Sequence, residues 1–185
     1  MIGQLPKELE VNGKLLKIRY DFRACLDILC AYADPDLLDY EKVMVAFKIF
    51  YIDKVEDKDY EEAYNKMLWF LNLGDMITEE NVRNYKLYDW EQDEQIIFAA
   101  VNKVAGYETR ATKELHFWTF ISYFYEIGDG TFSYITSIRN KLRKNEKLDK
   151  SEKEYYKENE SRIKLHKKQS KREKDITDKL NKLLD

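Results

Sequence analysis

The sequence predicts a mainly α protein: a multi-helix bundle around a buried central helix, with a short N-terminal β-hairpin and a long basic C-terminal helix. The 185 residues include only six Gly and two Pro, which favours long helices over tight turns. Apolar residues recur at helical spacing along most of the chain, which is typical of helices with one buried face. The stretch 115–127 is apolar on every side except one narrow stripe, so we expect the other helices to pack on it.

A β-hairpin is expected within residues 1–20. The segments 8–11 and 14–20 flank Asn12 and Gly13, and both of these residue types tolerate the positive φ angles of a type I′ turn. An isolated two-stranded hairpin is only marginally stable. We therefore expect this hairpin to lie on the helices.

Three helices are expected after the hairpin. The first begins after Asp21, a residue type that caps helix N-termini, and ends before Pro35, which cannot continue a helix. The second covers about 39–51, and the third runs from about residue 60 to a stop at Gly74. The apolar stripes predicted to face the core are Phe22, Cys25, Leu26, Leu29 and Ala33, then Tyr40, Val43, Met44, Phe47 and Tyr51, then Tyr60, Ala63, Tyr64, Met67, Leu68 and Leu71.

Three apolar residues of the third helix, Trp69, Phe70 and Leu73, fall outside its stripe. Either a second layer covers them or they form an exposed patch that could bind a partner. The covered alternative is favoured, because a fold of several helices usually buries such residues.

A fourth helix is expected over about 90–104, before the central helix 115–127, with Thr109 or Thr112 as the cap of the latter. His116 lies on the narrow polar stripe of the central helix. This position favours a structural histidine held by hydrogen bonds over a metal ligand. Gly128 ends the helix.

A sixth helix follows, with Asp129 or Thr131 as its cap. Its predicted inward residues are Phe132, Ile135, Ile138 and Leu142, and its predicted outward residues are Arg139, Asn140, Arg143 and Lys144.

A charged C-terminal extension is expected over 149–185, after a helical domain over 1–148. Ser151 and Glu154 have the spacing of a capping box, so a last helix should begin there. Apolar residues are sparse in the extension until a short stripe near its end, formed by Ile176, Leu180, Leu183 and Leu184.

Charge is distributed unevenly along the chain. Residues 1–138 hold 15 Lys and Arg against 25 Asp and Glu, and residues 139–185 hold 17 against 10, so an acidic body carries a basic arm. The basic residues could bind phosphates of a nucleic acid. The acidic residues interleaved among them favour a solvated helix with internal ion pairs such as Glu160–Lys164 instead.

No pattern in the sequence predicts catalysis, a cofactor or a metal site. The two histidines fall on separate helices, and no phosphate-binding loop or nucleophile–base spacing is present. Cys25 and Cys30 lie on different faces of one helix, which favours reduced thiols in a reducing compartment. The absence of a signal peptide and of a long apolar run predicts a soluble intracellular protein. The absence of a catalytic pattern predicts that it is not an enzyme.

Several segments resemble a family of small bacteriophage proteins that are encoded in the tail module of siphophages and prophages of Gram-positive bacteria, beside the tape measure gene. The resemblance covers roughly residues 4–165. Its residues are Leu5-Pro6, Val11-Asn12-Gly13, Asp21-Phe22-Arg23, Phe117-Trp118-Thr119-Phe120, Tyr123-Phe124, Ile127-Gly128-Asp129-Gly130-Thr131-Phe132, Ile135, Ser137-Ile138-Arg139-Asn140-Lys141 and Lys147 to Tyr156.

The resemblance implies a tail assembly protein, of the tail assembly chaperone type. Such a protein would bind the tape measure protein in the host cytoplasm before the tail tube polymerises, need no cofactor, and be absent from the mature virion. Two alternatives stay open: a structural tail component, and a nucleic-acid-binding phage accessory protein that acts through the basic C-terminal helices. The candidate partner-binding residues are Trp69, Phe70, Leu73, Arg139, Arg143, Lys144, Ile176, Leu180 and Leu183.

Overall fold

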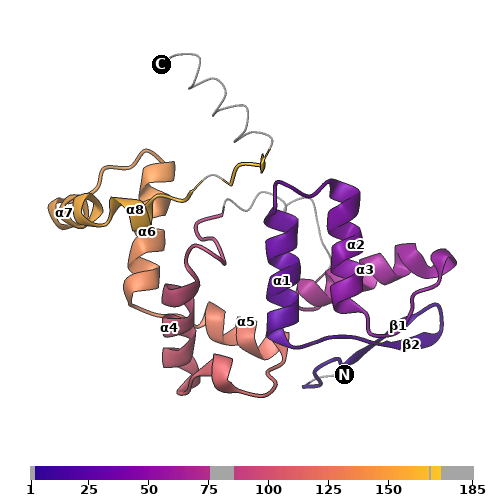
Figure 1. Ribbon diagram of the computed structural model, residues 1–185. Coiled ribbons are helices and arrows are strands. Elements are labelled where there is room, and N and C mark those ends of the chain that lie inside the picture. Colours follow the sequence, from indigo (N-terminus) through magenta and orange to yellow (C-terminus); the bar gives the residue numbers. More distant parts are fainter. Residues whose placement is uncertain (1–2, 76–85, 167, 172–185) are drawn as a thin grey trace, which may run out of the picture. The chain divides into compact units, whose positions relative to one another are not determined.

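The computed structural model describes residues 3–75, 86–166 and 168–171. The chain forms two compact units, one of residues 1–76 with 167–185 and the other of residues 77–166. The predicted mainly α fold with an N-terminal hairpin is confirmed (Figure 1). The described elements are β1 (Glu8–Val11), β2 (Lys14–Lys17), α1 (Phe22–Ala33), α2 (Asp39–Phe50), η1 (Asp57–Asp59), α3 (Tyr60–Leu71), α4 (Glu94–Ala105), η3 (Thr109–Ala111), α5 (Phe117–Tyr125), α6 (Thr131–Arg143), α7 (Lys150–Glu158) and α8 (Glu160–Ile163).

The hairpin of the first unit has the predicted turn. β1 and β2 pair in antiparallel register, and Asn12 and Gly13 have φ angles of 47° and 76°. The turn is fastened to the start of α3, because the Asn12 side chain donates to Asp59 Oδ1 (2.7 Å) and its backbone N–H donates to Glu62 Oε2 (3.1 Å). The hairpin therefore lies on a helix, as expected for a pair of short strands.

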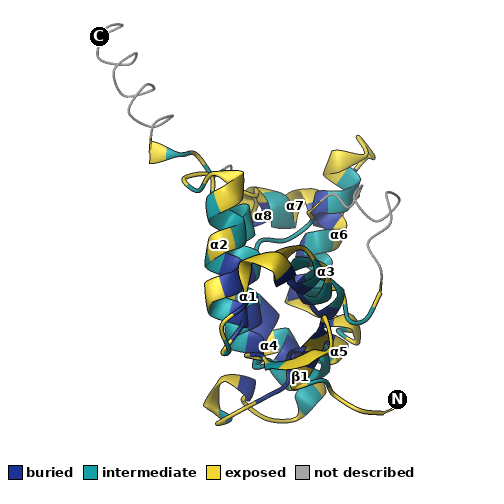
Figure 2. Ribbon diagram, turned by 90° about the vertical axis from the view of Figure 1, so that its right-hand side faces the viewer, coloured by how far each residue is buried: buried dark blue, intermediate teal, exposed yellow. Residues whose placement is uncertain are grey.

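Helices α1, α2 and α3 supply the core of the first unit. Asp21 caps α1 as predicted, accepting the Arg23 N–H at 3.0 Å. Figure 2 shows both buried and exposed residues along α2. Its buried side chains are Ala46, Phe47 and Phe50, whereas Tyr40 and Met44 are 64% and 57% exposed. The predicted inward stripe of this helix is thus wrong at these two positions, because α2 is rotated to place Ala46 and Phe50 inward.

The two cysteines of α1 are thiols in different surroundings. Cys25 is buried and Cys30 is half-buried. Burial, with the nearby Asp21 and Asp27 carboxylates, raises the pKa of the Cys25 thiol far above its usual range. The thiolate is the reactive form of cysteine, so the Cys25 side chain should be chemically inert in the folded protein.

We expect a disulfide reagent such as Ellman's reagent to label Cys30 rapidly and Cys25 only after unfolding. The measurement is the thiol titration of the native chain and of the Cys30→Ser and Cys25→Ser variants. The Cys30→Ser variant should lose the rapid phase, and the Cys25→Ser variant should keep it. Two thiols reacting at the same rate in the native chain would contradict this assignment.

In the second unit, α5 is shorter than the predicted central helix and has a different cap. His116 is the N-cap residue, and its Nδ1 accepts the Trp118 N–H at 3.1 Å. Thr109 is instead held by Asn102, whose Oδ1 accepts from both its N–H and its hydroxyl. The prediction of a structural, hydrogen-bonded His116 is confirmed. Trp118 is half-buried.

An aromatic cluster forms the centre of the second unit. The Trp90 and Phe124 rings lie 5.0 Å apart, Tyr88 and Phe124 lie 5.1 Å apart, and Phe124 and Phe132 lie 5.5 Å apart between centroids. Phe98 and Phe120 lie at 5.6 Å. Tilted and edge-on ring pairs at these distances add to the stabilisation from burial, so α4, α5 and the start of α6 share one core.

The helices α7 and α8 belong to the second unit, which differs from the expected division at residue 148. Ile135, Ile138, Leu148 and Ile163 form one buried apolar cluster, so the chain beyond 148 packs on α6. The capping box of α7 also begins two residues earlier than expected. Asp149 accepts the Glu152 N–H at 2.8 Å, and Glu152 Oε2 accepts the Asp149 N–H at 2.9 Å.

Candidate partner-binding surfaces

Arg139 was expected to face outward, and the structure buries it. Its side chain is 5% exposed and forms a bidentate ion pair with Asp93, at 2.6 and 2.9 Å. The remaining donors bind backbone carbonyl oxygens of Leu87 (2.9 Å), Arg162 (2.8 Å) and Ile163 (2.7 Å). All five N–H donors of the guanidinium are therefore used inside the second unit.

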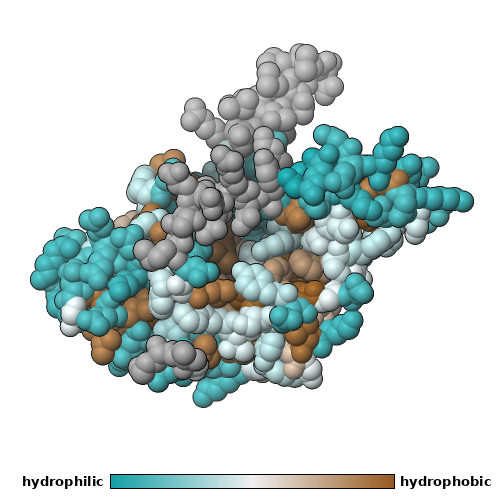
Figure 3. Space-filling view, turned by 180° about the vertical axis from the view of Figure 1, so that it is seen from behind, coloured by the Kyte–Doolittle hydropathy of each residue, from teal (hydrophilic) through white to brown (hydrophobic). Residues whose placement is uncertain are grey.

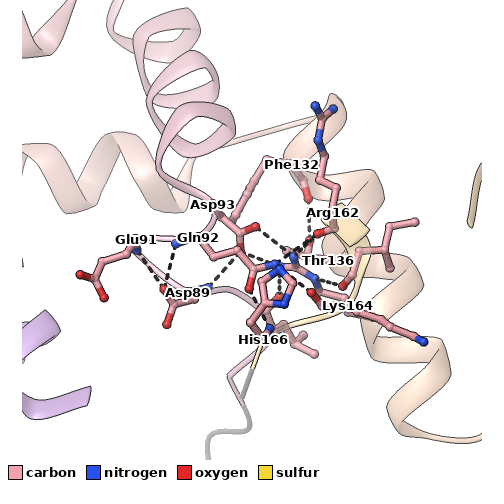
Figure 4. Close-up of polar contacts among 12 residues, drawn as sticks. Asp89, Glu91, Gln92, Asp93, Phe132, Thr136, Arg162, Lys164 and His166 are labelled. Atoms are coloured by element: carbon pink, nitrogen blue, oxygen red, sulfur yellow. Dashed lines mark hydrogen bonds and ion pairs between the residues drawn. The ribbon is translucent and has the colours of Figure 1, made fainter. Parts of the chain in front are cut away.

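A second layer of hydrogen bonds surrounds this ion pair (Figure 4). Asp93 Oδ2 also accepts the Asp89 N–H at 2.9 Å. Gln92 donates to the Lys164 carbonyl at 2.8 Å and accepts the His166 N–H at 2.8 Å. The start of α4 thus holds the chain that leaves α8, and we call residues Asp89, Gln92, Asp93 and Arg139 with their partners the Arg139 clamp.

The clamp removes Arg139 from the candidate partner-binding residues. Leaving a buried carboxylate without its cation is strongly unfavourable, so the guanidinium cannot leave Asp93 to bind a ligand without unfolding this region. One sequence signal pointed to its burial: Arg139 follows Ile135 by four residues and Ile138 by one, inside the apolar stripe. No spacing in the sequence identifies Asp93 as its partner, because the two residues lie 46 positions apart.

The apolar residues at the end of α3 mostly fit the covered alternative. Phe70 is fully buried, and its ring meets Phe50 edge-on at 5.2 Å between centroids. Trp69 and Leu73 are half-buried. Leu73 has a φ of 59° and Gly74 a φ of 95°, and the Gly74 N–H bonds to the Trp69 carbonyl at 2.9 Å. These residues close the helix, as a Gly stop was expected to do.

The other predicted basic residues lie on the surface. Arg143 is exposed and donates to Asn140 Oδ1 at 2.9 Å, and Lys144 is exposed with its Nζ 3.9 Å from Glu146. The expected Glu160–Lys164 ion pair is confirmed at 2.6 Å. The hydrogen bond from Lys164 lowers the pKa of Glu160. The candidate residues Ile176, Leu180 and Leu183 lie outside the described residues.

The described part of the chain contains an apolar groove that the sequence did not predict. It has a volume of about 390 Å³ and lies between α4 and the loop that joins α5 to α6. Its α4 wall carries Ile96, Ala99, Ala100, Lys103 and Val104, and its loop wall runs from Glu126 to Phe132. We call it the α4 groove.

The loop wall of the groove is fixed on one side and open on the other. Lys103 Nζ donates to the Asp129 carbonyl at 3.1 Å, which ties the loop to α4. A Cβ placed on Gly128 or Gly130 would meet no atom within 4 Å beyond the neighbouring residues, so the loop borders open space. Gly130 is also the N-cap residue of α6, in place of the expected Asp129 or Thr131.

Two kinds of surface therefore lie on the second unit. Seen from behind, the region around α7 is mostly hydrophilic, and larger brown apolar areas are visible elsewhere on the unit (Figure 3). Val104 at the groove is 36% exposed, and Ala99 is also exposed. An apolar groove with charged edges is a surface suited to an amphipathic partner helix.

The described ranges are residues 3–75, 86–166 and 168–171. There, no group of three or more His, Cys, Asp or Glu side chains could hold a metal ion. No helix within those ranges is long and apolar enough to cross a membrane.

The family model for the Bacteriophage Gp15 protein matches residues 1–165. The chain belongs to this bacteriophage family. The match includes the hairpin, the α4 groove and every residue of the Arg139 clamp except His166. It ends before the C-terminal stripe that begins at Ile176. Comparison with curated proteins and with solved structures finds no match.

Proposed function

We propose that this Gp15-family protein is a tail assembly chaperone. It binds the tape measure protein in the host cytoplasm, keeps it soluble until the tail tube polymerises, and is absent from the mature virion. The observation that carries the proposal is the α4 groove, an open apolar surface inside the region that matches the phage family. The protein acts by binding, without catalysis or a cofactor.

The groove is suited to a helix of a long helical partner. Ala99 and Ala100 are small, so a partner backbone can approach α4 closely. Each Leu- or Phe-sized side chain that becomes buried there would stabilise the complex by about 1.5–3 kcal/mol. Lys103 and Glu126 supply opposite charges at the edges, which favour one orientation of the partner over others.

Co-expression with the tape measure protein tests this function, with a variant that fills the groove. Ala99→Arg places a long charged side chain at an exposed helical position, where Arg preserves helix propensity. We expect the soluble fraction of the tape measure protein to fall to the level seen without the chaperone. Ser137→Arg is the matched control, because Ser137 is exposed on α6 and does not line the groove.

The fold of both variants is checked by circular dichroism and thermal unfolding. Equal tape measure solubility with and without the wild-type protein would refute the chaperone function. Stoichiometric amounts of the protein in purified virions would favour a structural tail component instead. DNA binding that falls steeply with salt would favour the nucleic-acid-binding alternative.

A further inference from the structure

Helix α2 of the first unit carries exposed residues along its length (Figure 2). Tyr40 and Met44 are 64% and 57% exposed, and Lys48 is exposed as well. These residues recur every four positions, so they lie on the same side of the helix. Glu41 lies on that side too, because it precedes Met44 by three residues and Lys48 by seven. We call these four residues the α2 face.

The core of the first unit uses the other side of α2. Ala46 and Phe50 are fully buried, and they follow Met44 and Lys48 by two residues each. On a helix with about 3.6 residues per turn, residues two apart point to nearly opposite sides. The α2 face therefore points away from the core. Large apolar side chains grouped on such a face mark a surface that binds another molecule.

The charges of the α2 face indicate which molecule that is. Glu41 lies in the first turn of α2 and Lys48 in its last turn. When two copies of the helix pack antiparallel about a two-fold axis, each Glu41 lies beside the partner's Lys48. The two Met44 side chains then meet near the axis, because Met44 lies close to the midpoint between Glu41 and Lys48. A parallel pair would place like charges together, so the face is complementary to itself in the antiparallel orientation.

Neighbouring contacts hold both charged residues in position. Glu41 Oε2 accepts the Leu38 N–H at 2.8 Å, which fixes the carboxylate at the start of the helix. A carboxylate accepts several hydrogen bonds, so Glu41 can also accept from an ammonium group. The Lys48 carbonyl accepts from Arg19 Nη1 at 3.1 Å, which holds the last turn of α2 while the Lys48 side chain is exposed.

We propose that two copies of this chain form a dimer through their α2 faces, packed antiparallel with Met44 at the two-fold axis and each Glu41 paired with the partner's Lys48. Tyr40 adds apolar area beside the pairs of opposite charge. A single pair of twelve-residue helices, each about 18 Å long, is a small interface, so the dimer dissociates at low concentration. This inference is independent of the α4 groove and of any tape measure protein.

Sedimentation equilibrium of the full chain from about 1 µM to about 1 mM measures the dimer dissociation constant. Lys48→Glu should raise this constant by about tenfold or more, because it places two carboxylates together at each end of the interface. Adding Glu41→Lys to this variant restores opposite charges and should recover most of the affinity. Lys54→Glu is the matched control, since Lys54 is exposed outside α2, and it should keep the wild-type constant. Circular dichroism checks that each variant is folded.

Disulfide formation tests the orientation of the two helices, in a Cys30→Ser background that leaves only the buried Cys25. Met44→Cys should link two chains on mild oxidation, because the two positions meet at the axis. Lys48→Cys should not, since the two copies lie about 10 Å apart along the helix axis, beyond the reach of a disulfide. Equal linking at both positions would show a parallel pair and overturn the proposal. A chain that stays monomeric throughout the concentration range, or equal constants for Lys48→Glu and Lys54→Glu, would overturn it as well.

Discussion

Replacing Arg139 with Met is expected to lower the free energy of unfolding of the second unit by about 3–5 kcal/mol. The side chain of Asp93 is 1% exposed, so the variant leaves a buried carboxylate with no cation beside it. The carbonyls of Leu87, Arg162 and Ile163 lose their donors at the same time. Met approximates the length of the Arg stem, so the loss reports the polar contacts more than the packing.

Urea unfolding followed by circular dichroism provides the measurement. Arg143→Met is the matched control on the same helix, and because Arg143 is exposed its effect should stay within about 0.5 kcal/mol. Replacing Asp93 with Leu in the Arg139→Met background should recover part of the loss, since no buried charge then remains. A loss below about 1 kcal/mol for Arg139→Met would show that the ion pair is solvated.

Replacing Phe70 with Ala should lower the free energy of unfolding of the first unit by about 3–5 kcal/mol. Phe70 is fully buried, and the substitution leaves a cavity beside the Phe50 ring while removing their edge-on contact. Trp69→Ala is the comparison variant. Because Trp69 is half-buried, its removal should lower the free energy clearly less.

A third variant, Phe70→Leu, separates core packing from partner binding at this end of α3. Phe70→Leu retains most of the buried volume and should leave the solubility of a co-expressed tape measure protein unchanged. Near-wild-type stability of Phe70→Ala would place this ring at the surface and restore it as a candidate contact. Urea midpoints and slopes of the three variants distinguish these outcomes.

Local features of the fold were predictable because short-range sequence determines them. Asn12-Gly13 specified the hairpin turn, and Asp21 specified the start of α1, since each acts on backbone groups within a few residues. The orientation of α2 was not predictable in this way. Tyr40 and Met44 lie at the same helical spacing as buried residues, and only the packing of the neighbouring helices decides which side faces inward.

The contacts of the candidate site could not be predicted from short stretches of sequence, because they join residues that lie far apart in the chain. Nothing near Arg139 in the sequence indicates Asp93, so a basic residue beside other basic residues was assigned to the surface. The α4 groove combines an ordinary helical stripe with a loop that the sequence marked only as a helix end at Gly128. A groove forms where neighbouring elements leave part of a helix uncovered. The spacing of apolar residues in the sequence does not show which part that is.

The Arg139 clamp has a consequence for how this chain can vary. Arg139 and Gln92 hold residues 162–166 only through backbone atoms: the carbonyls of Arg162, Ile163 and Lys164, and the N–H of His166. Apart from the buried Ile163, such contacts place little demand on side-chain identity. The contacts that hold the end of the second unit therefore stop at His166. Replacing or removing the residues after 166 would leave every one of these contacts in place.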